Sequence, residues 1–214
     1  MFTLKNVAIA LTLTVAALVA FVASRPTDFR IERSLAIPAS ADVVFAQVSD
    51  FHAWTAWSPW EGLDPAMKRQ YEGVSGKTGS SFFWDGNDQV GSGRMSITRL
   101  EPSSFVEIKL EFFKPWPGVY TTQLALASEG DRTKVTWSMR GQNNFLMKAM
   151  SLFMDMDKMV GADYERGLQK LASVSSAIFA RQTALDEANR AAVAPTNDLT
   201  TDQPAAAPPA SPTP

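Results

Sequence analysis

The chain contains no cysteine and only one histidine, His52. The first absence excludes disulfides, thiolate nucleophiles and cysteine-based metal sites. The single histidine excludes histidine-rich zinc sites, and it allows a Ser-His-Asp triad only if His52 is the base. A lone histidine beside a phenylalanine and several tryptophans is more typical of a helix surface or cap than of a catalyst. We therefore expect neither a metal site nor a cofactor.

An excess of charge of one sign is also absent. Twenty Lys and Arg residues face 22 Asp and Glu residues, and the formal net charge is −2. Without a basic cluster, the sequence predicts no nucleic-acid partner. A content of 45% hydrophobic and 20% charged residues is typical of a globular protein, and 214 residues suffice for one domain with additional segments.

One long hydrophobic run is present, from Val7 to Ala23. Its roughly 17 residues are at the short end for a membrane-spanning helix but exceed most signal-peptide cores. We predict that residues 1–26 form an uncleaved single-pass anchor that contacts the membrane through residues 7–23. Because such anchors act as start-transfer signals, we expect the domain outside the cytoplasm. The alternative is a signal peptide cleaved near Ala23, which would give a secreted protein.

The other end of the chain, residues 181–214, is predicted to be a disordered tail. From about Ala191 it consists mainly of Pro, Ala and Thr. Such a segment buries too little apolar surface to offset the entropy lost on ordering.

Residues 27–180 are predicted to form a single α+β domain. Apolar and polar residues alternate from Phe29 to Ile37, which indicates a strand, and two short helices should follow, the second in the tryptophan-rich stretch before Pro59. Six further strand-like runs follow: KRQYEG, SSFFWDGND, GSGRMSITRL, FVEIKLEFF, VYTTQLALA and TKVTWSMR. A long helix is expected from Phe145 to about Ile178. We predict a curved antiparallel sheet of about seven strands wrapped round this helix, with a ligand cavity between them.

Four segments carry a resemblance to a known family: WSPWEGLDPAM, GSGRMSI, FFKP and LFMDMDKMVGADYERGL. In this order of elements, the chain resembles the SRPBCC superfamily of START-like helix-grip proteins, and more narrowly its bacterial polyketide cyclase/dehydrase-like branch. The resemblance covers about residues 29–171. It implies a small apolar or amphipathic ligand, either lipid-like or aromatic, and fold alone does not select a reaction.

Large side chains on the expected inner faces are the candidate ligand pocket. They are Trp54, Trp57, Trp84, Phe112, Trp137, Phe153, Met156, Val160 and Tyr164, together with Arg33. For Trp54 and Trp57, core packing is the stronger interpretation, a ligand wall the second, and membrane contact the third.

Charged residues near these faces require partners. Arg33 lies on the apolar face of the first strand, while Asp157 and Asp163 flank the apolar stripe of the last helix. The leading interpretation is an ion pair, with Arg33 or Arg94, that fixes the helix against the sheet. The alternative is a ligand anchor, or a buried carboxylate acting as general acid or base in a cyclase/dehydrase-like enzyme. A structural envelope protein is the third hypothesis.

Overall fold

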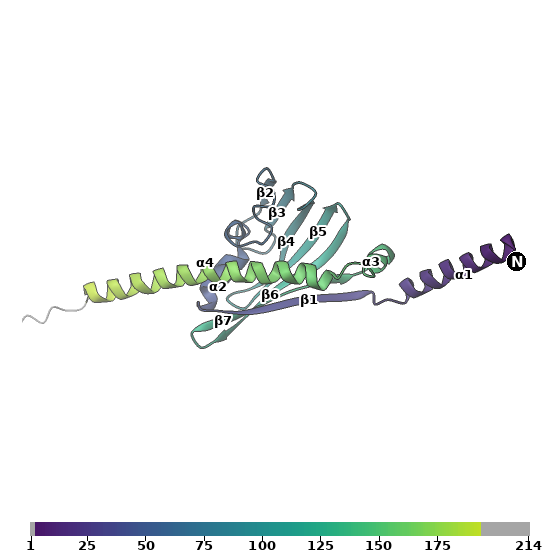
Figure 1. Ribbon diagram of the computed structural model, residues 1–214. Helices are drawn as coiled ribbons and strands as arrows, with labels where there is room; N and C mark the ends of the chain where they lie inside the picture. Colours follow the sequence, from purple (N-terminus) through teal and green to yellow (C-terminus); the bar gives the residue numbers. More distant parts are fainter. Residues whose placement is uncertain (1–2, 194–214) are drawn as a thin grey trace, which may run out of the picture.

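Alternating apolar and polar residues build one seven-stranded antiparallel sheet in the order β1-β7-β6-β5-β4-β3-β2 (Figure 1). The computed structural model describes residues 3–193. The strands are β1 Asp28–Ile37, β2 Lys68–Glu72, β3 Ser81–Asp85, β4 Ser92–Glu101, β5 Phe105–Lys114, β6 Gly118–Glu129 and β7 Arg132–Gln142. The helices are α1 Leu4–Ala23, α2 Ala41–Ser49, the 3-10 helix η1 Ala53–Ala56, α3 Phe145–Met150 and α4 Met156–Val193. The predicted α+β fold is confirmed.

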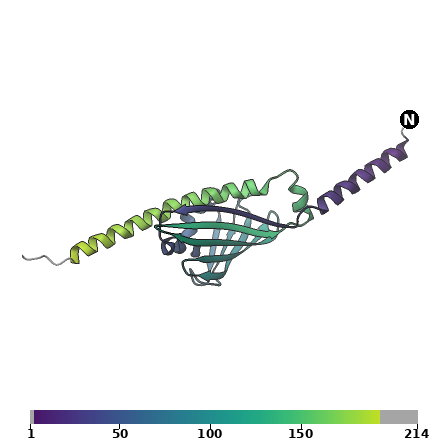
Figure 2. The same ribbon diagram turned by 90° about the horizontal axis from the view of Figure 1, so that it is seen from below.

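The sheet is curved, and α4 lies along its inner face (Figures 1 and 2). Because β1 pairs with β7, the first and last strands lie side by side, and α4 packs mainly on β1, α2 and η1. A register shift between Ser92 and Gly93 forms a bulge in β4, next to Gly91 with its φ of +62°. Glycine adopts positive φ without steric cost, so Gly91 allows the chain to bend beside the bulge.

The single helix predicted from Phe145 is wrong at its beginning, because the segment forms two helices. Ser151 ends α3 and its hydroxyl donates to the carbonyl of Lys148 (2.7 Å). Asp155 then accepts a hydrogen bond from the backbone N–H of Lys158 (3.1 Å), the interaction that an N-terminal cap makes. This bond lowers the pKa of the Asp155 carboxyl. Local capping by two polar side chains therefore overrides the helical periodicity.

The end of α4 also differs from the expectation, since the helix continues past residue 180 to Val193. Residues 181–193, which we assigned to the tail, include four alanines and two arginines, and these residues favour helix formation. The part of the predicted tail from residue 194 onward lies outside the described residues.

The predicted N-terminal apolar helix is present as α1, exposed along nearly its whole length. Its length and composition suit either a membrane anchor or a signal sequence. Thr12 and Thr14 each donate to the carbonyl four residues earlier (3.0 and 2.9 Å), so their hydroxyls are satisfied within the helix.

Candidate ligand-binding site

The tryptophans that follow α2 form part of the core. Trp54 and Trp57 are buried, and their indole N–H groups donate to the carbonyls of Val48 and Gln47 (both 3.1 Å). Their ring centroids are 4.5 Å apart, and both rings meet Trp137 of β7 edge-on. The burial expected for Trp54 and Trp57 is confirmed. Any contact that they make with a ligand stays a prediction.

The space beneath the first half of α4 is filled by a stacked aromatic pair. The rings of Trp137 and Tyr164 lie 4.0 Å apart and almost parallel, at 7°. Both side chains are buried, and burial raises the pKa of the Tyr164 hydroxyl. Above them is Gly167, where an added Cβ would approach a ring carbon of Trp137 to 2.8 Å and Cδ of Pro59 to 3.0 Å. Trp137 and Pro59 therefore approach the backbone of α4 closely at Gly167.

A second set of aromatic side chains on the inner face stays half-buried. Phe29 of β1, Tyr120 of β6, Phe112 of β5 and Trp84 of β3 contact one another edge-on, with successive centroids 5.7, 6.0 and 5.6 Å apart. Trp84 continues the series to Phe82 at 6.0 Å. We call these five residues the aromatic floor.

Glycines shape the aromatic floor. An added Cβ at Gly93 would approach the Trp84 ring to 2.5 Å, and one at Gly118 would approach the Tyr120 hydroxyl to 2.6 Å. A Cβ at Gly141 would overlap the Tyr120 ring as well. The Trp84 and Tyr120 rings therefore lie directly over backbone that carries no side chains. The result is a wide apolar surface that is only partly covered, which is suited to a ligand with a flat or extended apolar body.

Two of the floor residues, Trp84 and Phe112, were predicted as pocket residues, and three were not. Phe29, Phe82 and Tyr120 were missed, although Phe29 lies between the polar residues Asp28 and Arg30 in its strand. The glycines of GSG in β4 were a usable signal, since a glycine inside a strand often marks the close approach of another group.

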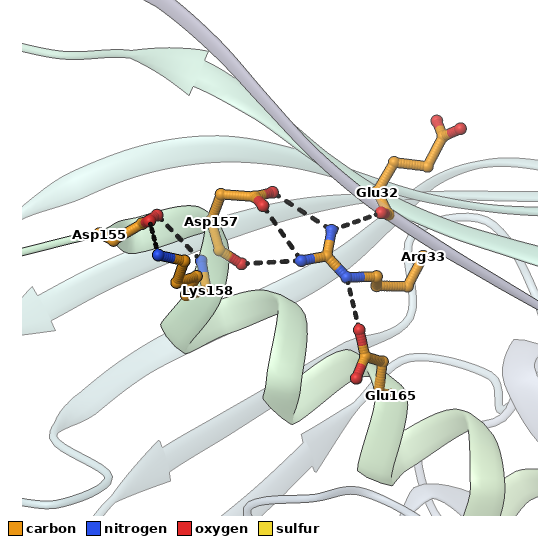
Figure 3. Close-up of polar contacts among 6 residues, drawn as sticks. All are labelled: Glu32, Arg33, Asp155, Asp157, Lys158 and Glu165. Atoms are coloured by element: carbon orange, nitrogen blue, oxygen red, sulfur yellow. Dashed lines mark hydrogen bonds and ion pairs between the residues drawn. The ribbon is translucent and has the colours of Figure 1, made fainter.

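Arg33 is the centre of a polar cluster that joins β1 to the start of α4 (Figure 3). Its guanidinium donates to the Asp157 carboxylate (3.1 and 3.2 Å), the Asp157 carbonyl (3.1 Å), the Glu165 carboxylate (2.8 Å) and the Glu32 carbonyl (2.8 Å). The hydrogen bonds to Asp157, and then to Glu165, raise the pKa of Arg33. Of the ion pairs predicted between Asp157 or Asp163 and Arg33 or Arg94, the pair of Arg33 with Asp157 is formed.

The sequence reasoning missed two members of this cluster, Gly161 and Glu165. Residues 157, 161 and 165 follow one another at intervals of four and so share one side of the helix. An added Cβ at Gly161 would overlap the Arg33 guanidinium, so the glycine makes room for it. The spacing of residues 157, 161 and 165 could have shown that they share one side of the helix. It could not have shown which strand would supply the cation.

Neither candidate carboxylate is isolated from water or from partners. The Asp157 side chain is 56% exposed and paired with Arg33, so the premise of a buried carboxylate at this position is wrong. Asp163 accepts from Arg166 and from the indole N–H of Trp60 (3.3 Å). Arg94, the other cation considered, binds Glu111 on the outer face of the sheet (2.7 Å).

The remaining predicted pocket residues come from the beginning of the last helix. Met156 and Val160 are half-buried, whereas Phe153 is 88% exposed. Phe153 lies in the connection between α3 and α4, so the break in the helix turns it away from the sheet. Its inclusion in the pocket is therefore corrected. Two shallow hollows in the described residues are lined mainly by outward-facing side chains such as Phe83, Phe113, Lys109 and Arg140.

His52 belongs to an exposed polar cluster with Asp50 and Ser75. One oxygen of Asp50 accepts from the Ser75 hydroxyl, from the His52 backbone N–H (2.9 Å) and from Nδ1 of His52 (3.0 Å). The His52 ring also stacks on Tyr71 at 4.0 Å. In a catalytic triad the serine would contact the histidine nitrogen that faces away from the carboxylate. Here Ser75 contacts the carboxylate itself, so the cluster connects α2 to the β2–β3 hairpin.

This cluster predicts an acid-dependent contribution to stability. Burial raises the pKa of Asp50, but the hydrogen bonds from Ser75 and His52 outweigh it and hold the pKa below its usual value. The resulting stabilisation is present above pH about 4 and is lost as the pH falls through the folded-state pKa. We therefore expect Ser75→Ala to lower the melting temperature at neutral pH. The difference in melting temperature between the variant and the wild-type protein should disappear at acid pH. Circular dichroism across pH measures this, with the exposed Ser128→Ala as control. A difference that is constant with pH would contradict the assignment.

The fold and the inner-face surface define the class of protein. A curved antiparallel sheet with β1 beside β7 and a C-terminal helix against its inner face is the helix-grip architecture of the SRPBCC superfamily. Residues 28–176 match the family model described as polyketide cyclase / dehydrase and lipid transport, and the chain belongs to this family. Proteins with this fold commonly bind small hydrophobic ligands.

Solved structures show the same fold at low sequence identity. The Mll3558 protein from Rhizobium loti is 18% identical with a TM-score of 0.52, over 68% of this chain and 96% of its own. Protein CV1439 from Chromobacterium violaceum is 14% identical with a TM-score of 0.51, over 71% and 99%. A protein from Thermobifida fusca is 18% identical with a TM-score of 0.52, over 68% and 92%. No curated protein matches the chain.

Proposed function

We propose that this protein is a membrane-anchored domain that binds one small hydrophobic or amphipathic molecule against the aromatic floor. The observation that carries the proposal is the contrast within one face of the sheet. Trp137 of β7 is buried beneath α4, against Trp57 and Tyr164, whereas the floor side chains stay half-buried. Half-covered aromatic rings in contact with one another offer a ligand apolar area that is already ordered.

The family supports the same class of ligand, since its description includes lipid transport. The Arg33 cluster gives a polar group near one side of the floor, because Arg33 and Phe29 project from the same face of β1, four residues apart. With Asp157 and Glu165 already bound to it, Arg33 mainly fixes α4. We therefore assign the ligand's binding energy chiefly to apolar contact. We place the domain outside the cytoplasm and held by α1.

The proposal predicts that filling the surface of the floor will weaken binding. Leu110 of β5 is half-buried on the inner face, between the strands that carry Phe82 and Tyr120. Leu110→Trp is expected to lower the affinity for a dansylated fatty acid about tenfold, a loss of about 1.4 kcal/mol of binding free energy. Energy transfer from tryptophan to the dansyl group, titrated with the full chain in a non-ionic detergent, gives the Kd.

The matched control is Lys109→Trp, because Lys109 is the neighbouring residue and points to the outer face. Both variants add one tryptophan and one extra donor, and both experience the same partitioning of the probe into detergent. Equal affinities for the two variants would place the ligand elsewhere. Melting temperatures of both variants establish that each is folded.

A further inference from the structure

Exposed large hydrophobic side chains are concentrated at one end of the domain. Outside α1, twelve such side chains are exposed in the described residues, and eight of them lie in residues 113–119 and 145–159. We define the anchor-side patch as six of these: Phe113, Trp116, Val119, Phe145, Leu146 and Phe153. Their exposed fractions run from 48% for Phe113 to 88% for Phe153. A surface on which exposed apolar side chains gather marks an interaction site, whereas single exposed apolar residues do not.

The strand register places both segments at the same end of the sheet. Asp28 at the start of β1 pairs with Gln142 at the end of β7, directly before α3. Thr121 near the start of β6 pairs with Arg140, so the β5–β6 hairpin reaches this end as well. The floor residues Phe29, Phe112 and Tyr120 lie within a few residues of it. The patch thus surrounds the edge at which the aromatic floor ends.

The C-terminal end of α1 is fixed to this same edge. Nζ of Lys148 in α3 donates to Thr27 Oγ1 (2.9 Å) and to the carbonyl of Ala23, the last residue of α1 (3.4 Å). The backbone N–H of Asn143 donates to the Thr27 carbonyl (2.7 Å), and Val22 of α1 is buried. Both views show α1 and α3 together at one end of the domain (Figures 1 and 2). A bilayer crossed by α1 would therefore have its surface at the patch.

We infer that the anchor-side patch docks on the surface of the lipid bilayer that α1 crosses, so that the aromatic floor opens directly onto the membrane. This inference deepens the proposed function and rests on its membrane anchor. The patch is continuous with α1, which itself exposes apolar residues to be covered by lipid. Trp116, between two prolines at the tip of the β5–β6 hairpin, is of the residue type enriched at membrane interfaces. Apolar side chains held at that level insert about 5–10 Å into the boundary between headgroups and acyl chains. The ligand is then an amphipathic molecule that enters from the bilayer.

The absence of cysteine allows a direct test, because a single introduced cysteine can carry a fluorophore without background labelling. The test positions are Trp116→Cys and Leu146→Cys in the patch. Val74→Cys is the control, because Val74 is 69% exposed in the β2–β3 connection, at the opposite end of the sheet. Val15→Cys in α1 reports on the anchor. Each full-length variant is labelled with the fluorophore NBD and reconstituted into phosphatidylcholine vesicles. The vesicles are prepared with and without a phospholipid whose acyl chain carries a spin label near its carboxyl end.

We expect the labels at residues 116 and 146 to emit at shorter wavelength and to lose about half of their intensity to the spin-labelled lipid. The label at residue 74 should be unaffected by the lipid and fully quenched by iodide in the water. Unquenched labels at residues 116 and 146 beside a quenched label at residue 15 would overturn the docking while leaving the anchor intact. An unquenched label at residue 15 would instead show that the anchor, and with it the proposed location, is wrong.

Shielding of residues 116 and 146 from both lipid and iodide would also overturn the inference, since it would assign the patch to a second copy or to another protein. If either cysteine variant fails to fold, Phe153→Cys replaces it. Its side chain is almost fully exposed, so its removal leaves the packing unchanged.

Discussion

Trp137→Ala is expected to lower the free energy of unfolding by about 3–5 kcal/mol, the usual result of removing a large buried aromatic side chain. Trp137 is 1% exposed, stacked on Tyr164, and in edge contact with Trp54, Trp57 and Trp60. These neighbours belong to η1, α4 and the loop after η1, so the cavity left by the indole would loosen several elements together. Denaturant unfolding of the full chain in a non-ionic detergent, followed by near-ultraviolet circular dichroism, measures the loss.

Trp116→Ala is the matched control, because the same residue type is removed from a position that is 53% exposed. Surface substitutions of this kind usually change stability by less than about 0.5 kcal/mol. Equal losses for Trp116→Ala and Trp137→Ala would contradict the assignment of Trp137 to the centre of the core.

Gly161→Ala is expected to destabilise the protein by about 1–3 kcal/mol, because the added methyl overlaps the Arg33 guanidinium. A flexible side chain would ordinarily move aside. Here the guanidinium is held by Asp157, Glu165 and the Glu32 carbonyl, so any movement breaks charged hydrogen bonds. The glycine at position 161 of α4 is therefore required because the Arg33 side chain of β1 occupies the space that a methyl group would take.

The same substitution should reverse its sign when Arg33 is absent. In an Arg33→Ala background, the methyl at position 161 meets no guanidinium, and alanine favours the helix over glycine by up to about 1 kcal/mol. A double-mutant cycle on the unfolding free energy measures this coupling. Gly167→Ala is the control: its methyl would meet Trp137 and Pro59, which Arg33→Ala leaves in place. An equal effect of Gly161→Ala in both backgrounds would contradict this role for Arg33.

Together these contacts indicate how α4 is held without closing over the whole sheet. The first turns of α4 are fixed to β1 by Arg33, and the turn around Gly167 rests on Trp137. The floor lies along the anchor-side edge of the sheet and stays half-buried. If the bilayer covers that edge, the surface that would otherwise expose apolar rings to water becomes an entry route for a ligand.

The sequence by itself determined the seven strands, their alternation and the aromatic content of the inner face. Period-two alternation is a local property, so Phe112 and Trp137 could be assigned to the inner face from their own strands. An ion pair between the last helix and the sheet was also predictable, because a charge on an apolar face requires a partner, but the choice of Arg33 with Asp157 was left open. Glu165 was missed because its role depends on how far along α4 the contact with β1 falls.

Only the tertiary structure decided which inner-face side chains are covered. Trp137 and Trp84 both point to the inner face of the sheet, yet Trp137 is buried beneath α4 and Trp84 stays half-buried over Gly93. The difference arises from where the helix crosses the sheet, which is set by long-range packing against β1, α2 and η1. Capping at Asp155 likewise turned Phe153 out of the expected pocket and onto the anchor-side patch. Periodicity fixes the face on which a side chain lies, and burial on that face depends on contacts between elements distant in the chain.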